Sequence, residues 1–287
     1  MQSVKVVAIM AKPGVDRART VVPELLAWLA NRGIEARCDE DTAAYVEGVR
    51  GLPRTQVPEG AGMVILLGGD GTLLSAVRAI DGRDIPIFAV NLGGLGFLTA
   101  TAVDELYPEL DRVFRGEHTV GMRRLLHCER LRSGRPASAY EALNDVVVDK
   151  IDIARMIDVD AWVDDQLVTS YKADGVIVST PTGSTAYSLS AGGPIIFPTV
   201  EALSITPICP HMLTHRPVVV PADRVISLVV QGRDDSAFLT IDGQVGEPLK
   251  HGDRVICRSS NQTIRLIRPP RVKFFDVLRQ KLKWGER

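Results

Sequence analysis

A short, wholly apolar run followed by glycines constrains the fold of this chain more than any other feature. Met63–Leu67 holds five consecutive apolar residues, and Gly68 and Gly69 follow it. A run so short and so uniformly apolar is typical of a strand that is buried on both faces of a parallel sheet. Apolar residues with helical spacing lie on either side of it, so the sequence predicts the alternating strands and helices of an α/β domain.

The rest of the first region follows the same alternation. Beside Met63–Leu67, strands are expected at 4–10 and 87–90, and helices at 21–33, at 72–80, and from 101 or 104 to 114. Thr72 is the expected cap of the second helix, because a threonine hydroxyl can accept a bond from a first-turn N–H. We assign residues 1–119 to an α/β domain and expect a C-terminal helix within 269–287 to join it.

From about Val120 the pattern changes to short strands separated by turn residues. The expected strands are 143–148, 157–163, 175–179, 218–221, 225–230, 237–241 and 255–257. Asp164-Asp165 and Asp234-Asp235 are expected to form hairpin turns. This spacing is typical of a sandwich or barrel. Residues 120–268 are therefore predicted to form a mostly β, sandwich-like domain.

The charge balance excludes one class of partner. The chain has 34 Lys and Arg against 35 Asp and Glu, a formal net charge of -1. Proteins that grip a nucleic-acid backbone usually carry a basic surplus, because their affinity comes from neutralising phosphates. We therefore expect no nucleic-acid partner.

Two long charge-free runs are poor candidates for membrane spans. Ile85–Val103 is interrupted by glycines, and Gly175–Val200 by Ser, Thr and Pro, so neither would form a satisfied helix in lipid. The N-terminus lacks the features of a signal peptide, and the four cysteines form no C-x-x-C pair. We expect a cytoplasmic protein with reduced thiols and no membrane partner.

The histidines do not indicate a metal site. His211 and His215 are four residues apart, but Pro210 and Pro217 argue against a helix there. No carboxylate accompanies them in ligand spacing, so we assign no metal-ligating residue.

The strongest local motif lies directly after the apolar strand. Gly68-Gly69-Asp70-Gly71-Thr72 leads into the expected helix. Ligands of open α/β sheets bind beyond the carboxyl ends of the strands, and glycines there let backbone N–H groups approach phosphate oxygens. The alternative is a tight turn whose aspartate only caps the helix. Neither a G-x-x-x-x-G-K-[ST] loop nor a G-x-G-x-x-G fingerprint is present.

A second motif lies in the longer charge-free run. Thr180–Pro194 combines hydroxyls, glycines and one tyrosine, and follows the strand expected at 175–179. Such a passage from strand to helix can hold a nucleotide through neutral hydrogen bonds and a ring face. The alternative is an ordinary Ser/Thr loop.

Taken together, these motifs resemble those of the NAD kinase family. The matching segments, in chain order, are GGDGT at 68–72, Asn144-Asp145, TPTGSTAYSLSAGGPI at 180–195, PICPH at 207–211 with Arg216-Pro217, and Asp242-Gly243-Gln244. GGDGT is shared with diacylglycerol and sphingosine kinases and, in variant form, with phosphofructokinases. The TPTGSTAY run is far more specific to NAD kinases.

The resemblance implies a reaction and a role for the first motif. The terminal phosphoryl group of ATP, or of inorganic polyphosphate, would pass to the 2′-hydroxyl of the adenosine ribose of NAD. Asp70 would be the proton acceptor, and Gly68, Gly69, Gly71 and Thr72 would hold the donor phosphates. A divalent cation, Mg²⁺, would be carried with the donor.

The resemblance also implies which residues bind NAD. By position they are Asp70, Gly71, Asn144, Asp145, Arg155, Lys172, Asp174, Thr185, Ala186, Tyr187, Ser188, Leu189, Ser190 and Gln244. Many relatives have glutamate where this chain has Asp145. From sequence alone, Arg155 and Lys172 could equally be solvated cations at strand edges. Residues 120–268 would then be the dinucleotide-binding domain, and members of the family usually form homodimers or homotetramers.

Two other functions are compatible with part of the pattern. A lipid kinase of the GGDGT superfamily would share the first motif, but TPTGSTAY and Asn144-Asp145 argue against it. A non-catalytic dinucleotide-binding regulator could keep the adenosine pocket, but Asp70 within its intact glycine frame argues against that function.

Overall fold

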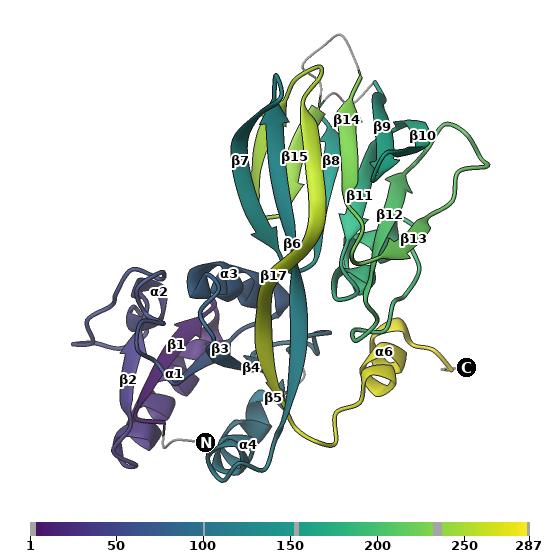
Figure 1. Ribbon diagram of the computed structural model, residues 1–287. Coiled ribbons are helices and arrows are strands. Elements are labelled where there is room, and N and C mark those ends of the chain that lie inside the picture. Colours follow the sequence, from purple (N-terminus) through teal and green to yellow (C-terminus); the bar gives the residue numbers. More distant parts are fainter. Residues whose placement is uncertain (1–3, 100, 152–154, 232–236, 286–287) are drawn as a thin grey trace. The chain divides into compact units, whose positions relative to one another are not determined.

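The computed structural model describes residues 4–99, 101–151, 155–231 and 237–285. The chain forms two compact units, Met1–Met122 with Ile264–Arg287, and Arg123–Thr263. It passes from one unit to the other within two long strands, β6 (Thr119–Arg132) and β17 (Arg254–Arg268) (Figure 1). The hairpin predicted at Asp234-Asp235 lies outside the described residues.

The first unit is built on a parallel sheet. Its strand order is β2 (Glu35–Cys38), β1 (Val6–Ala11), β3 (Met63–Leu67) and β4 (Pro86–Asn91). β5 (Thr101–Ala102) and the last part of β17 also pair with β4 in parallel. The apolar run Met63–Leu67 is therefore a central strand, as predicted.

Helices cover both faces of this sheet. Met63, Ile65 and Leu67 share one core with the apolar faces of α1 (Asp16–Ala30) and α4 (Leu106–Phe114). Val64 and Leu66 point to the other face and are also fully buried. On that face α3 (Asp70–Ile80) packs on β3. The apolar residues of α3 lie outside the core formed with α1 and α4. Burial on both faces explains why β3 contains no polar residue.

Three helix predictions needed correction. α1 begins at Asp16 rather than at residue 21 and ends at Ala30 rather than near Gly33. α3 begins at Asp70 and its N-cap is Gly69, not Thr72, because the Thr72 N–H already bonds the Gly69 carbonyl within the first turn. α4 begins at Leu106, after a 3-10 turn at Val103–Glu105. The C-terminal helix α6 is shorter than its segment and spans Phe274–Leu282.

The second unit contains an antiparallel sheet of six strands. Its order is β13 (Val218–Pro221), β12 (Ala202–Ile208), β11 (Gly175–Ser179), β8 (Asp145–Lys150), β15 (Ala237–Ile241) and β16 (Val245–Leu249). A second set of strands runs in the order β10 (Gln166–Ala173), β9 (Ile157–Val163), β14 (Ile226–Val230), β17, β6 and β7 (Arg135–Ala142). Buried residues from both sets form one core, so the predicted α/β and mostly β, sandwich-like fold classes are confirmed.

One strand of this unit is much longer than predicted. The sequence indicated a strand only at 255–257, whereas β17 continues to Arg268. Arg258–Thr263 is uniformly polar and carries no alternating apolar signal, so sequence periodicity does not detect it. The turn at Asp164-Asp165 joins β9 to β10 as expected, with Asp164 at a φ of 55°.

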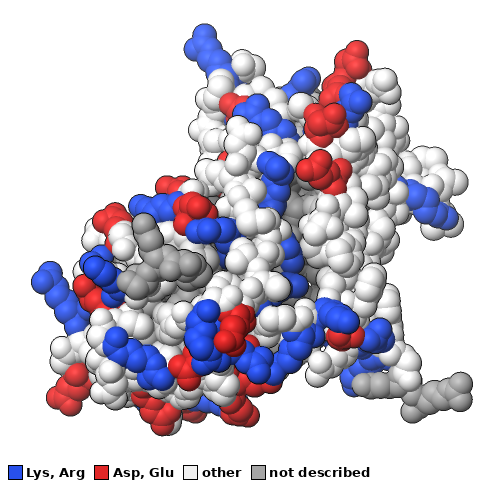
Figure 2. All heavy atoms as spheres, turned by 60° about the horizontal axis from the view of Figure 1, so that its bottom comes forward, with Lys and Arg blue, Asp and Glu red and all other residues white. Residues whose placement is uncertain are grey.

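Charges of both signs are distributed over the protein surface. Figure 2 shows basic and acidic side chains interspersed over the face that it draws, in keeping with the net charge of -1. The four cysteines are free thiols, and only Cys209 among them is exposed. Every helix in the described residues is too short or too polar to cross a bilayer.

Candidate active site

The GGDGT motif forms the turn between β3 and α3. Gly68 is buried, and a Cβ at this position would overlap the Thr72 side chain, so the turn can fold tightly onto the helix only with glycine. Gly69 is the N-cap and has no side chain with which to cap the first turn. The start of α3 therefore presents backbone rather than a capping side chain, which is the arrangement that anion sites at helix N-termini use.

The Asp70 carboxylate is held by the loop that follows β4. One oxygen, Oδ1, accepts bonds from the backbone N–H groups of Leu98 (3.1 Å) and Thr99 (3.0 Å) and from the Thr99 hydroxyl (3.0 Å). The other oxygen, Oδ2, accepts one bond, from the Phe97 N–H at 2.8 Å. A carboxylate has about four acceptor positions, two on each oxygen. Oδ1 is therefore saturated, and Oδ2 keeps room for a further donor.

A buried network supports this loop. The Asn91 amide donates to the Thr99 hydroxyl at 2.9 Å, and its carbonyl accepts from the Gly93 N–H at 2.8 Å. Gly96 is packed so closely that a Cβ would overlap both the Asp70 carboxylate and the Thr99 hydroxyl. Sequence reasoning did not identify Asn91 or Thr99. The sequence signal that could have identified this loop was Asn91 with Gly93, Gly94 and Gly96, in the charge-free run that follows an apolar strand.

A half-buried cation, Arg268, adds to the electrostatics of Asp70. Arg268 lies at the end of β17, in the same unit. Burial lowers the pKa of its guanidinium, and the nearby Asp70 charge acts in the opposite direction. The Asp70 charge therefore offsets part of the cost of burying the Arg268 guanidinium.

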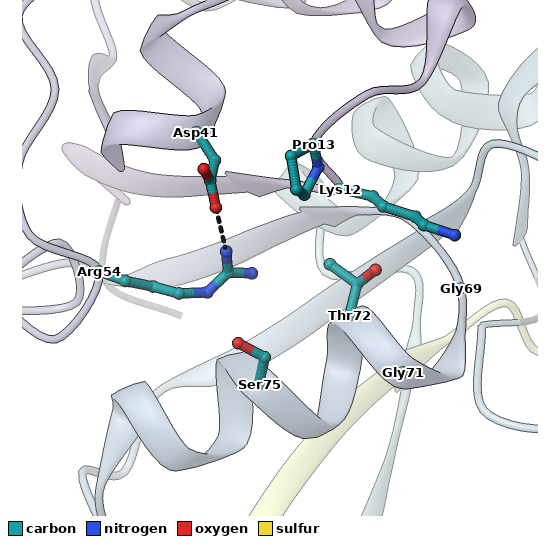
Figure 3. Close-up of a pocket in the computed structure, with 8 residues that line it drawn as sticks. All are labelled: Lys12, Pro13, Asp41, Arg54, Gly69, Gly71, Thr72 and Ser75. Carbon is teal, nitrogen blue, oxygen red and sulfur yellow. Dashed lines mark ion pairs between the residues drawn. The ribbon is translucent and has the colours of Figure 1, made fainter. Parts of the chain in front are cut away.

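A cavity of about 360 Å³ lies at the start of α3 (Figure 3). On the helix side its wall consists of Gly69, Gly71, Thr72 and Ser75. Opposite them lie Lys12 and Pro13, which follow β1, with Asp41 from α2 (Glu40–Ala43) and Arg54. The cavity thus combines hydroxyls, a helix start and two cations, a donor set suited to an anion. Sequence reasoning identified only the glycines and Thr72.

In the second unit, three of the sequence motifs meet at one end of the six-stranded sheet. Ser179, at the end of β11, pairs with Asp145, at the start of β8, and Ile241 of β15 pairs with Val146. The Asn144-Asp145 pair, the TPTGSTAY run and the Asp242 turn therefore lie together. The Asp242 carboxylate joins them by accepting bonds from the N–H groups of residues 143, 144 and 145, at 2.9, 2.7 and 3.2 Å.

Asn144 has a fixed backbone and an available side-chain oxygen. Its carbonyl accepts a bond from the Thr180 N–H at 2.9 Å, and Gly183 packs against that carbonyl so tightly that a Cβ would overlap it. The side-chain oxygen is buried and has no hydrogen-bond partner among the described residues. A buried acceptor left without a donor is costly, which favours its use by a ligand.

Asp145 is only 4% exposed, and its environment changes its acidity. Burial, and then the nearby Asp242 charge, raise its pKa from 3.8 to about 7. Near neutral pH the carboxyl therefore exists both as an acceptor-only carboxylate and as an acid that can donate a hydrogen bond.

The predicted adenosine-pocket residues occupy a 3-10 turn, η2 (Gly183–Thr185), and the short helix α5 (Tyr187–Ser190). Ser188 is buried and bonds the Thr206 hydroxyl at 3.1 Å. Thr185, Ala186 and Leu189 are partly buried, and Ser190 is exposed. Tyr187 is 43% exposed; its pKa is raised by partial burial and, less strongly, by nearby acidic groups including Asp149 and Asp174.

The structure does not gather every predicted NAD-binding residue. Gln244 is exposed in the turn after Asp242, at the same sheet end as Asn144. Asp174 lies near the opposite end of β8 and β11, beside Lys150 and about 20 Å along the strands from Asn144. There it pairs with Lys150 at 2.6 Å. Lys172 and Arg155 are exposed, with Arg155 in the segment before β9.

The described residues contain no group of three or more His, Cys, Asp or Glu positioned to hold a metal. His211 is exposed, and His215 packs edge-on against the Tyr171 ring.

The packing around Gly96 leads to a first prediction. Gly96→Ala should lower the free energy of unfolding by about 1–3 kcal/mol, because the new methyl group would displace Asp70 or Thr99. Gly94 lies in the same loop with nothing within 4 Å of a built Cβ, so Gly94→Ala is the matched control and should change stability by less than about 0.5 kcal/mol. Equal effects in denaturant titrations would contradict the proposed packing.

The burial of Asp145 leads to a second prediction. A carboxyl with a higher pKa in the folded state than in the unfolded state favours folding at low pH, and this contribution falls as pH rises from about 4 to about 7. Asp145→Asn removes the buried charge. The variant should therefore have a higher Tm than the wild type at pH 8, with a smaller difference at pH 5. The exposed Asp165→Asn is the control, and a difference independent of pH would contradict the assignment.

Comparisons with known proteins agree with these motifs. The model of the ATP-NAD kinase N-terminal domain matches residues 7–118, and that of the ATP-NAD kinase C-terminal domain matches residues 143–269. An NAD kinase of Solibacter usitatus is 58% identical over all of both chains, and one of Koribacter versatilis is 50% identical over 99% of each.

Two solved structures are also similar. Yeast NADH kinase complexed with NADH has a TM-score of 0.93 and 25% identity, over 100% of this chain and 90% of that one. An NAD kinase from Archaeoglobus fulgidus in complex with ATP has a TM-score of 0.79 and 27% identity, over 97% of this chain and 98% of that one. With matches to both domains and to relatives over their whole length, the chain belongs to the NAD kinase family.

Proposed function

We propose that the protein transfers the terminal phosphoryl group of ATP to the 2′-hydroxyl of the adenosine ribose of NAD, giving NADP. The observation that carries this proposal is a carboxylate with one open acceptor position, at the start of the helix that also lines an anion-suited cavity. The curated relatives named NAD kinase support the same reaction, and the two similar solved structures, bound to NADH and to ATP, support the same substrates.

Asp70 acts as the base in this proposal. A ribose hydroxyl is a weak nucleophile until its proton can pass to a positioned acceptor, and such acceptors contribute about 100- to 10,000-fold to the rate. Oδ2 has the open position, and the bonds to Oδ1 fix the direction in which it points. The hydroxyl proton moves to Oδ2 as the ribose oxygen forms a bond to the terminal phosphorus of ATP. The bond from that phosphorus to the bridging oxygen breaks, and ADP leaves.

Gly68, Gly69, Gly71 and Thr72 hold the donor phosphates, with the backbone of the α3 start directed at them. A divalent cation, which we propose is Mg²⁺, would neutralise part of the phosphate charge when bound with the donor. Thr72, Ser75 and Asp41 line the cavity and are the residues that would hold this cation once donor phosphates occupy the cavity.

In the second unit, Asn144 and Asp145 bind the polar groups of NAD. The unpartnered Asn144 oxygen accepts from a ligand hydroxyl or amide, and Asp145 lies beside it with its backbone held by Asp242. Thr185, Ala186, Tyr187, Ser188, Leu189 and Ser190 form the adenosine pocket, where the half-exposed Tyr187 ring offers a stacking face. Gln244 adds an amide at the same sheet end.

Other parts of the initial prediction stay predictions. Three predicted NAD-binding residues do not lie beside Asn144 within one chain: Arg155, Lys172 and Asp174. For these three, the family resemblance is the sole support for a role in NAD binding. The division at residues 119 and 268, use of polyphosphate as donor, assembly as a homodimer or homotetramer, and cytoplasmic location also await a direct test.

The function is tested by incubating the purified protein with NAD, ATP and Mg²⁺ and measuring NADP with an NADP-specific dehydrogenase. We expect NADP to accumulate with time and to depend on both substrates. Folded protein that forms no NADP with ATP would contradict the proposal.

Asp70→Asn tests the role of the base. The amide keeps an acceptor toward Leu98 and Thr99 but cannot take a proton, so turnover should fall at least about 100-fold while NAD affinity changes little. Asp81→Asn, at the other end of α3 and exposed, is the matched control and should retain full turnover. Undiminished turnover in a folded Asp70→Asn protein would remove Asp70 from this role.

A further inference from the structure

Arg54 carries hydrogen-bond donors that the described residues leave unused. Its Nη1 pairs with Asp39 at 2.8 Å and lies 3.5 Å from Asp41. Its Nε and Nη2 atoms are buried and have no hydrogen-bond partner among the described residues. These two nitrogens form the side of the guanidinium that binds a pair of phosphate oxygens. Buried donors without acceptors are rare in native proteins and call for an explanation such as a bound ion.

The carboxylates beside Arg54 hold it in place. Asp39 is 1% exposed and is itself fixed by the backbone N–H (2.9 Å) and the hydroxyl of Thr42. Asp41 is half exposed, so solvent screens its charge. Both carboxylates lie against Nη1 of Arg54. The side of the guanidinium that carries Nε and Nη2 can therefore bind another anion.

Lys12 supplies a second cation from a rigid position. Its N–H donates to the Leu67 carbonyl at 2.8 Å, and its own carbonyl accepts from the Tyr45 hydroxyl at 2.7 Å. The ammonium group makes no ion pair within the described part of the chain. Figure 3 shows its side chain extended toward the turn at Gly69.

The opposite wall indicates what kind of anion the cavity takes. Thr72 and Ser75 contribute hydroxyls, one helical turn apart, beside the start of α3. Among the described residues that line the cavity there is no aromatic ring, and Pro13 is the apolar side chain. A nucleobase would find no stacking surface there, whereas a chain of phosphates would meet donors on both sides.

We propose that Lys12 and Arg54 bind the phosphate chain of the phosphoryl donor, opposite the GGDGT turn. This inference rests on the proposed function and adds two donor-binding residues from outside that motif. Because the contacts are made to phosphates, loss of either cation should affect ATP and inorganic polyphosphate alike.

Two substitutions test the proposal without removing the partners of Asp39. Lys12→Met deletes an exposed charge, and Arg54→Lys keeps a cation near Asp39 but loses the paired donors. With NAD saturating, each should raise the KM for ATP about tenfold, as expected for one charge-assisted bond, and should leave the KM for NAD unchanged. If polyphosphate serves as donor, its KM should rise by a similar factor.

Lys5→Met is the matched control, because Lys5 is an exposed lysine that precedes β1 whereas Lys12 follows it. It should leave both KM values unchanged. Calorimetric titration with tripolyphosphate, without NAD, gives a readout independent of turnover and should show weaker binding only for the Lys12 and Arg54 variants.

The outcomes separate this inference from the function on which it rests. Wild-type protein that forms no NADP would overturn the proposed function. NADP formation with unchanged donor KM and tripolyphosphate binding in both variants would overturn this inference alone. A lower Tm of Arg54→Lys without any change in donor KM would likewise overturn it, by making Arg54 a purely structural partner of Asp39.

Discussion

The site in the first unit depends on the four hydrogen bonds that the Asp70 carboxylate accepts from the loop after β4. They fix the loop to the start of α3 and at the same time orient the carboxylate. Without them, neighbouring ends of β3 and β4 would carry two independent turns. Glycine is needed at Gly96 for the same reason, since a side chain there would separate Asp70 from Thr99. Gly68 is needed for a different reason, because a side chain there would overlap Thr72 within the first turn itself.

The second unit uses a similar device. Asp242 accepts bonds from three successive N–H groups at the start of β8, which fixes the backbone of Asn144 and Asp145. In both places a carboxylate accepts bonds from backbone donors, and a polar group of the site keeps an unused acceptor position. These positions are one lone pair on Asp70 Oδ2 and the side-chain oxygen of Asn144. Polar groups left without partners in this way lower the stability of the folded protein, and a bound ligand can satisfy them.

Local patterns in the sequence predicted some elements to the residue and missed others. β3, β9, β11, β13 and β15 have the predicted bounds, because each is a compact apolar or alternating run between turn residues. The polar half of β17 has no such signal. The sequence motifs located the site residues Asp70 and Asn144. They did not locate the residues that orient Asp70 or that complete the cavity beside it. Thr99 and Arg54 reach the site only through tertiary structure: Thr99 through a loop 29 residues from Asp70, and Arg54 through a chain segment beside the Asp39 and Leu52 bridge.

The central claim is that Asp70 receives the ribose proton on its less occupied oxygen. A crystal structure of the complex with NAD tests this most directly. The account predicts the 2′-oxygen of the adenosine ribose at about 2.6–3.2 Å from the carboxylate oxygen that accepts from Phe97. The bonds from Leu98 and Thr99 should remain on the other oxygen. A 2′-hydroxyl bonded to any other acceptor, with both Asp70 oxygens turned toward the loop, would contradict the account.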